Sequence, residues 1–420
     1  MPLIKEVRAR KILDSRGEST IETEIVLDNK ISATASVPSG ASTGIYEAKI
    51  ARSESGATKD DDITKAIENV EVISTDLIKK DPQDQKEIDN IILELDGTQT
   101  KAHLGANATL SVSLATAKVA AKMLHVPLWK YIGNLFEYKS AYSIPTPMFN
   151  LIEGGKHSDN LLEFQEFLVI PSSSQSFSKA LQIGQKIYHR LKKQLASQNF
   201  STLTADEGGF APELGSNENA LKLLRSVIES KGYKLGENIF LGIDAASSSF
   251  VKDSKYEVDE LGGQQAASQL VKFYENLIKN YSLIYIEDPL SENDIKGWKK
   301  VFKDLGDKIQ IVGDDLTTTN PHRLQMALDE STINGIIIKP NQIGTLTETL
   351  AVVKIAQHKG LKVTVSHRSG ETEDTFIADL AVGIGADQVK FGAPSRERVI
   401  KYNRLLKIEE ELNASAGNYI

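Results

Sequence analysis

The sequence of 420 residues predicts an α/β protein with a small α+β domain, residues 1–137, followed by a (β/α)8 barrel, residues 138–420. Two observations support this prediction. A hairpin pattern near the N-terminus precedes two helical patterns. Beyond residue 138, short apolar runs alternate with helical segments, each pair the size of one strand–helix unit. The content of 40% hydrophobic and 25% charged residues is typical of a chain that buries a large core.

The N-terminal domain is expected to begin with an antiparallel hairpin. Residues 21–27 and 31–37 flank a turn-like Asp28–Lys30, and apolar residues alternate with polar ones in the second run. Apolar residues at helical spacing predict a helix around Ile63–Leu77, and an Ala- and Leu-rich stretch predicts another at Asn107–Leu124. Ile144–Pro147 cannot continue a helix, so it is expected to be a boundary strand or linker. The domain border is therefore placed near residue 138.

The barrel prediction depends on where the apolar runs end. Six runs end at a polar residue: Asp244, Glu287, Asp314, Lys339, His367 and Lys390. The segments Glu163–Ile170 and Leu203–Glu207 are expected to supply the other two strands. A doubly wound sheet is the alternative, but it would place function mainly at one switch point. Polar residues at the same end of nearly every strand favour a barrel, whose function lies at the C-terminal strand ends.

Three of the strand ends predict a metal site. Asp244, Glu287 and Asp314 end consecutive strands, and three carboxylates in one cavity raise one another's pKa values unless a cation lies among them. Oxygen ligands without cysteine favour Mg²⁺ or Mn²⁺ over zinc. The alternative for each residue alone is that it caps the following helix.

Cationic and titratable residues surround the predicted metal site. Lys339, Arg368 and Lys390 are expected in the same mouth, where Arg suits bidentate recognition of phosphate or carboxylate and Lys can act as a base if neighbouring cations lower its pKa. Together they predict a small, highly anionic substrate, although structural ion pairs with the acids are an alternative. His157 and His367 flank the strand ends. Asp206–Gly209 forms a loop compatible with a general acid.

Several classes of function are excluded or disfavoured. The absence of cysteine excludes disulfides, thiol nucleophiles and Cys-ligated metals. A net charge of −8 without basic clusters argues against nucleic-acid binding. No apolar run is long enough for a membrane span or a secretory signal, so a cytoplasmic location is expected. Gly40–Gly44 fits the Gly-x-Ser-x-Gly pattern, but it follows an N-terminal strand and is better interpreted as a mobile lid than as a hydrolase elbow.

Motifs along nearly the whole chain resemble those of enolases. They are Leu13–Gly17, Pro38–Gly44, Leu104–Ala108, Gln165–Phe167, Asp206–Phe210, Ile286–Pro289, Gly313–Leu316, Asn341–Thr345 and Ser366–Asp374. The resemblance implies reversible dehydration of 2-phosphoglycerate to phosphoenolpyruvate, an enolase-type barrel and two Mg²⁺ per active site, the second arriving with substrate. It also implies a homodimer or higher homo-oligomer.

The resemblance assigns a role to each matching residue. Lys339 would be the base and Glu207 the acid, with Glu166 beside Glu207 and His367 nearby. Asp244, Glu287 and Asp314 would hold the first Mg²⁺, and Ser42 would help to hold the second. The substrate would be bound by a larger set: Ser42, His157, Gln165, Glu166, Glu287, Asp314, Lys339, Arg368, Ser369 and Lys390.

The sequence also departs from the enolase pattern and leaves alternatives open. Ala205, Phe391, Lys407 and the segment 49–60 differ from the residues usual in the family, and their effect on turnover stays open. Another acid-sugar or amino-acid enzyme of the superfamily is a rival, but its usual Lys-x-Lys motif is absent. A non-catalytic scaffold is a second alternative.

Overall fold

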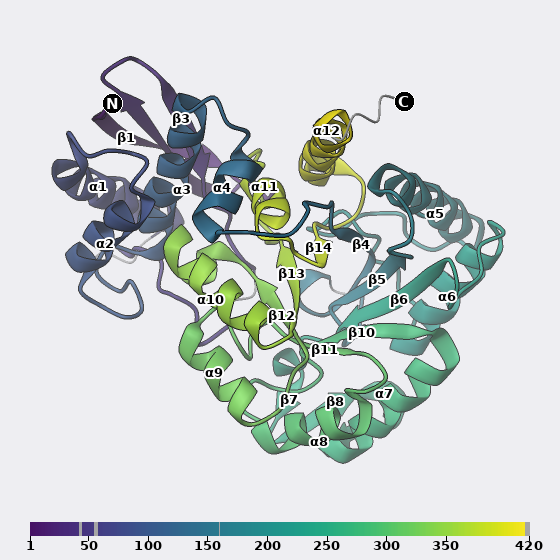
Figure 1. Cartoon of the computed structure of the whole chain (residues 1–420). Coiled ribbons are helices and arrows are strands. Elements are labelled where there is room, and N and C mark those ends of the chain that lie inside the picture. The colour runs from purple at the N-terminus through teal and green to yellow at the C-terminus, as the bar shows by residue number, and fades with distance from the viewer. Residues whose placement is uncertain (42–43, 54–57, 159, 416–420) are drawn as a thin grey trace.

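The computed structural model describes residues 1–41, 44–53, 58–158 and 160–415, and it contains an N-terminal domain beside a closed barrel (Figure 1). The N-terminal domain is a three-stranded antiparallel sheet in the order β1-β2-β3 with four helices. Its elements are β1 (Ile4–Leu13), β2 (Ser19–Leu27), β3 (Ser32–Ser36), α1 (Lys59–Leu77), α2 (Gln85–Asp96), α3 (Ala106–Met123) and α4 (Leu128–Phe136). The predicted hairpin is confirmed as β2 and β3, whereas β1 was not predicted.

The two predicted N-terminal helices are also confirmed, and local chemistry explains where α1 begins. The Thr58 side chain accepts a hydrogen bond from the Asp61 backbone N–H, and three acidic residues occupy the first turn, where they interact favourably with the helix dipole. One stripe of α1 is buried, as its helical spacing predicts. Helix α3 is buried almost all round. It packs against the sheet on one side and against the turn Pro340–Gln342 of the barrel on the other, so it links the two domains.

Eight strands close the barrel in the order β4-β5-β6-β10-β11-β12-β13-β14. The strands are β4 (Thr146–Glu153), β5 (Glu166–Pro171), β6 (Ile239–Asp244), β10 (Leu283–Glu287), β11 (Gln310–Gly313), β12 (Gly335–Ile338), β13 (Lys362–Ser366) and β14 (Gln388–Lys390). β5 runs antiparallel to β4 and β6, and the other neighbours are parallel. The closed ring confirms the barrel and excludes the doubly wound alternative.

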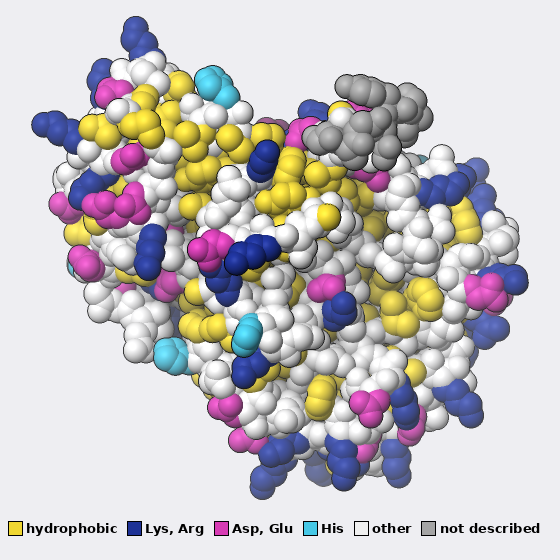
Figure 2. Space-filling model, viewed as in Figure 1, with side chains coloured by type: hydrophobic (Ala, Val, Ile, Leu, Met, Phe, Trp, Pro, Cys, Tyr) yellow, Lys and Arg dark blue, Asp and Glu magenta, His cyan; other side chains and the backbone are white. Residues whose placement is uncertain are grey.

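The helices α5–α12 surround the barrel, and a small additional sheet packs beside α7 (Figure 1). The helices are α5 (Phe177–Ser197), α6 (Asn217–Glu229), α7 (Ala267–Tyr281), α8 (Ile295–Leu305), α9 (Pro321–Asp329), α10 (Leu346–His358), α11 (Phe376–Gly383) and α12 (Val399–Ser415). The small sheet contains β7 (Val251–Lys252), β8 (Lys255–Val258) and β9 (Gly263–Gln265). On the face shown in Figure 2, Lys and Arg side chains are interspersed with Asp and Glu over these helices.

One of the eight predicted strands was wrong. Leu203–Glu207 is a loop that forms only an isolated bridge between Thr204 and Phe210. The Leu203 side chain is 78% exposed, so the segment has no apolar face to bury in the barrel. The eighth strand is β4, whose residues Met148–Ile152 are fully buried. Because of Pro145 and Pro147, the sequence was expected to form only a boundary strand or linker at Ile144–Pro147, yet Pro147 is tolerated near the start of β4.

The register of the barrel brings acidic residues together. Glu153 on β4 lies opposite Glu166 on β5, Glu166 lies opposite Asp244 on β6, and Asp244 lies opposite Glu287 on β10. Four carboxylates therefore form one row across four neighbouring strands, which we call the acidic row. Among the described residues, no helix combines the length and the apolar character needed to cross a bilayer.

Candidate active site

A small polar cavity opens at the C-terminal ends of the barrel strands. The predicted site residues that line it are His157, Gln165, Glu166, Glu207, Asp244, Asp314, Lys339, His367, Arg368, Ser369 and Lys390. Glu287 is fully buried and reaches this group through Lys390. Ser42, assigned to the second metal and the substrate, lies outside the described residues, as does part of the expected lid. The structure thus brings almost all of the predicted residues to one place.

Lys390 lies at the centre of the acidic row. Its ammonium donates to Glu166 Oε1 at 3.1 Å, Asp244 Oδ2 at 3.2 Å and Glu287 Oε1 at 2.8 Å, and all of these side chains are buried. Burial alone would lower the pKa of Lys390, but the three carboxylates outweigh it and raise the pKa well above its usual value. Lys390 is therefore a permanent cation that offsets part of the row's negative charge.

Lys390 does not fully offset burial and the repulsion among the carboxylates. Burial, with the Glu166 and Asp314 carboxylates, raises the pKa of Asp244 to about 7, although Lys390 opposes this shift. Burial and the Asp244 carboxylate raise the pKa of Glu287 to about 8. Buried carboxylates of this kind, with oxygen donors only, are the ligands that Mg²⁺ prefers. The donor set therefore fits the predicted metal.

Asp314 differs from the prediction that all three acids would have raised pKa values. Burial would raise the pKa of Asp314, but the ammonium of Lys339, in contact with Oδ2, holds it below the usual value.

Asp288 is a further residue near the site that was not predicted. Its carboxylate accepts the backbone N–H groups of Asp314 at 2.9 Å and Asp315 at 2.7 Å, so it fixes the backbone that carries Asp314. Oxygens of these three aspartates lie within 4.8 Å of one another.

The expected lowering of the Lys339 pKa is not found. Burial, Arg368 and Lys390 all act to lower this pKa, but the contact with Asp314 outweighs them and raises it. In this state Lys339 is an ammonium ion. A base requires the neutral amine, so proton removal requires that the charge on Asp314 be taken up by another cation.

Arg368 connects the cavity with the N-terminal domain. Its guanidinium donates to Glu47 Oε2 at 3.0 Å and to Asn341 Oδ1 at 3.1 Å. The hydroxyl of the neighbouring Ser369 accepts a hydrogen bond from the Ala41 backbone N–H. Glu47 was not predicted, because it lies 321 residues away from Arg368 in the sequence and only the fold brings them together. Both domains therefore build the predicted phosphate-binding end.

Glu207 lies among hydrogen-bond donors. Asn150 Nδ2 donates to Glu207 Oε2 at 3.0 Å, and His367 Nε2 lies 3.0 Å from the same oxygen. Arg398 Nη1, which can only donate, is 3.0 Å from His367 Nδ1, so neutral His367 carries its proton on Nε2, toward Glu207. Burial would raise the pKa of Glu207, but His367, His157 and Arg398 outweigh it and hold the pKa well below its usual value.

Glu166, predicted to lie beside Glu207, has the opposite character. Burial and the negative charge of Glu207 raise the pKa of Glu166 well above its usual value, although Lys390 acts against this. The two carboxyls thus differ: their surroundings favour the ionised form of Glu207 and the protonated form of Glu166. Such a divergence between neighbouring carboxyls is typical of acid–base sites.

The fold and the site together define a class of protein: a capped (β/α)8-barrel enzyme with its chemistry at the C-terminal strand ends. Comparison with protein-family models narrows the class. The model described as the enolase N-terminal domain matches residues 4–132, and the model described as the enolase C-terminal TIM barrel domain matches residues 141–419. The chain therefore belongs to the enolase family and is a lyase-type enzyme. The border near residue 138 stays a prediction.

Proposed function

We propose that this protein catalyses the reversible, Mg²⁺-dependent dehydration of 2-phosphoglycerate to phosphoenolpyruvate. The observation that carries the proposal is the shared cavity, which is lined by Lys339 at the end of β12, Glu207 on the loop after α5, Arg368, and Glu166 and Asp244 of the acidic row. Removal of a proton beside a carboxylate needs a base, a charge sink and an acid for the leaving hydroxyl. Each of these has a candidate in this cavity.

Asp244, Glu287 and Asp314 would hold the first Mg²⁺, and the second is assigned to Ser42 by resemblance. Bound Mg²⁺ supplies positive charge that offsets the negative charge developing on the substrate carboxylate. Within the chain, Asp314 controls Lys339: once its charge is shared with a cation, the contact that raises the Lys339 pKa weakens. Burial and the cations Arg368 and Lys390 then favour the neutral amine that removes the proton.

The remaining residues bind and orient the substrate. Arg368 and Ser369 are proposed to hold the phosphate, because a guanidinium fork matches phosphate oxygens. Gln165, His157 and His367 line the same cavity. Glu207 would protonate the departing hydroxyl, with Glu166 beside it. We further propose a cytoplasmic homodimer or larger homo-oligomer, supported by the family resemblance.

The proposal is tested by following two reactions in parallel: formation of phosphoenolpyruvate, and exchange of the C2 proton of 2-phosphoglycerate with solvent deuterium by NMR. Lys339→Ala should abolish both, because both need the base. Glu207→Gln should block dehydration and leave exchange largely intact, because the acid acts after proton removal.

Lys101→Ala provides a matched control. Lys101 is another buried lysine, 1% exposed, whose ammonium donates to Glu348 at 2.6 Å away from the cavity. Its loss should lower stability without separating exchange from dehydration. Wild-type protein that forms no phosphoenolpyruvate with Mg²⁺ would contradict the proposed function. Exchange that survives in Lys339→Ala but is lost in folded Glu207→Gln would reverse the assigned roles.

A further inference from the structure

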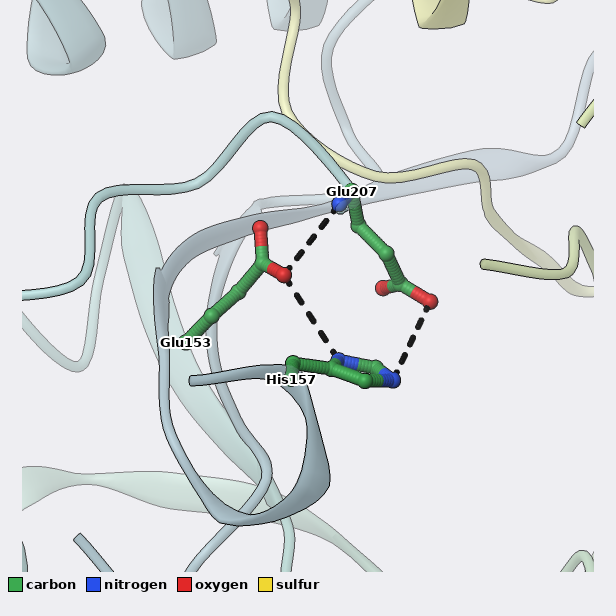
Figure 3. Close-up of side chains that lie close together, drawn as sticks. All are labelled: Glu153, His157 and Glu207. Carbon is green, nitrogen blue, oxygen red and sulfur yellow. Dashed lines mark hydrogen bonds and ion pairs between the residues drawn. The ribbon is translucent and has the colours of Figure 1, made fainter. Parts of the chain in front are cut away.

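A buried carboxyl that the proposed function does not use lies behind the cavity. Glu153, at the end of β4, is fully buried, and its Oε2 lies 3.6 Å from His157 Nδ1. The other ring nitrogen of His157, Nε2, lies 3.8 Å from Glu207 Oε1. Figure 3 shows the resulting chain of three side chains, in which the imidazole lies between the two carboxyl groups.

The sequence of contacts Glu153–His157–Glu207 offers a source for the proton that Glu207 needs as a general acid. A general acid must carry a proton, yet the donors around Glu207 hold it ionised. Asn150 has an amide, which is not acidic at neutral pH. Neutral His367 would become an imidazolate if it gave up its Nε2 proton, because its Nδ1 accepts from Arg398. His157 can give up the proton on Nε2 if it receives another on Nδ1, and Glu153 lies at Nδ1.

We propose that Glu153 supplies the proton that Glu207 delivers to the leaving hydroxyl, by way of His157. The proposal rests on the proposed function. In the transfer, the Oε2–H bond of Glu153 breaks as an N–H bond forms at His157 Nδ1, while the His157 Nε2–H bond breaks as an O–H bond forms at Glu207 Oε1. Glu207 then gives this proton to the departing hydroxyl, which leaves as water. To restore the starting state, His157 takes a proton from solvent on Nε2 and returns its Nδ1 proton to Glu153, and Lys339 releases to solvent the proton taken from C2.

The surroundings of Glu153 favour its protonated form. Burial raises its pKa well above the usual value, and the negative charges of Glu207 and of Glu166 on β5 add to this. Tyr188 on α5 donates its hydroxyl to the carbonyl oxygen of Gly208, in the loop that carries Glu207. The backbone N–H groups of Glu207 and Gly209, which donate to the two oxygens at 3.2 and 2.6 Å, act in the opposite direction without reversing the shift.

The same hydrogen bonds hold the loop that carries Glu207. A Cβ on Gly209 would lie 2.8 Å from Glu153 Oε1 and 3.0 Å from the Asn150 carbonyl oxygen, so the missing side chain allows the loop to approach Glu153. Both contacts of His157 must shorten to about 3 Å for transfer, as catalytic contacts commonly do when substrate binds. Glu153 acts through His157, so it is a positioning residue for the acid rather than a catalytic residue.

The test uses Glu153→Gln and Glu153→Asp in the full-length protein with Mg²⁺. Gln keeps the size and an oxygen acceptor for the Gly209 N–H, but it has no acidic proton. We expect the kcat of dehydration to fall about 100-fold in Glu153→Gln, in the range of acid–base contributions, while KM and C2 exchange stay near wild-type values. Glu153→Asp keeps the acidic proton and should recover part of the dehydration rate.

Asp89→Asn is the matched control, because Asp89 is also a fully buried carboxyl that accepts a backbone N–H, from Thr347, but it lies between α2 and α10. It should alter stability without changing the ratio of dehydration to exchange.

A wild-type kcat in Glu153→Gln would overturn the proposed proton relay from Glu153 through His157 to Glu207. A parallel fall of exchange and dehydration in Glu153→Gln would also overturn it, since it would indicate a structural role. If Glu153→Gln does not fold, a wild-type ratio in Glu153→Asp would be decisive against the relay, because the shorter side chain must slow transfer. An inactive wild type would instead refute the proposed function.

Discussion

Removal of divalent metal should make the stability of this protein fall as the pH rises above neutrality. The raised pKa of Glu287, from 4.5 to about 8, means that the folded chain binds a proton that the unfolded chain has lost. The state with more bound protons is disfavoured as the pH rises, so the free energy of unfolding must decrease until the pH passes about 8. Asp244, raised to about 7, acts in the same direction at the lower end of this range.

The size of the effect follows from linkage. One additional bound proton changes the free energy of unfolding by about 1.4 kcal/mol per pH unit. Buried His367, lowered to about 4, contributes with the opposite sign only below the unfolded histidine pKa of about 6.5, so the measurement begins there. Between about pH 6.5 and about pH 8, Glu287 alone should lower the free energy of unfolding of the metal-free protein by about 2 kcal/mol. The groups titrate together, so the loss belongs to the acidic row as a whole.

Urea unfolding with excess EDTA at several pH values in this range measures the loss. Saturating Mg²⁺ should flatten the dependence, because the cation stabilises the ionised carboxylates. Glu287→Gln, which is neutral at every pH, should reduce the slope in EDTA. Stability that is constant or rises between these pH values in the metal-free wild type would refute the electrostatic account of the site.

Three further predictions concern the metal, Lys390 and assembly. Excess EDTA should abolish formation of phosphoenolpyruvate and Mg²⁺ should restore it, whereas undiminished turnover would rule out the metal. Lys390→Met should lower the free energy of unfolding by about 3–5 kcal/mol, because it leaves buried carboxylates without their cation, and Mg²⁺ should recover part of the loss in urea unfolding. Unchanged stability would contradict the central role given to Lys390. By resemblance to enolases, in which Arg usually stands where this chain has Lys407, we expect Glu22 of one copy to pair with Lys407 of a second copy. Within one copy, Glu22 also contacts Arg10. Lys407→Arg should tighten association of the copies in sedimentation, because Arg can make a bidentate pair with a carboxylate and Lys cannot. Unchanged or weaker association would count against this pairing.

Much of the barrel could be predicted because strands buried on both faces read as continuous apolar runs. Asp244, Glu287 and Lys390 each end such a run, and strand ends meet in a barrel whatever the intervening helices contain. The antiparallel pair β4 and β5, with which the barrel begins, was harder to predict from the sequence. β4 contains Pro147 near its start and directly follows Pro145, and Leu203–Glu207 has a strand-like composition without a buried face.

The site residues that escaped prediction act across the fold rather than along the sequence. Glu153 follows an apolar run, but its importance arises from contacts with Glu207 and Gly209, more than fifty residues later. Glu47 meets Arg368 only because the N-terminal domain lies on the barrel. Asp288 could have been noticed in the sequence, because it directly follows Glu287. Its carboxylate accepts hydrogen bonds from backbone N–H groups, and a residue pattern does not show which carboxylates do so.

The acidic row has a consequence for the order in which the molecule assembles. Its four carboxylates come from β4, β5, β6 and β10. The Lys390 ammonium that pairs with those on β5, β6 and β10 comes from β14, the last of the described strands and the one that closes the ring onto β4. A growing polypeptide presents these acids before their partner has been synthesised. We expect a chain ending before Gln388 to keep them hydrated and apart at neutral pH and to become compact only on acidification, which small-angle scattering would reveal. Closure of the barrel and neutralisation of the acidic row would then occur together. The first barrel strands could pack stably only after β14 has been synthesised.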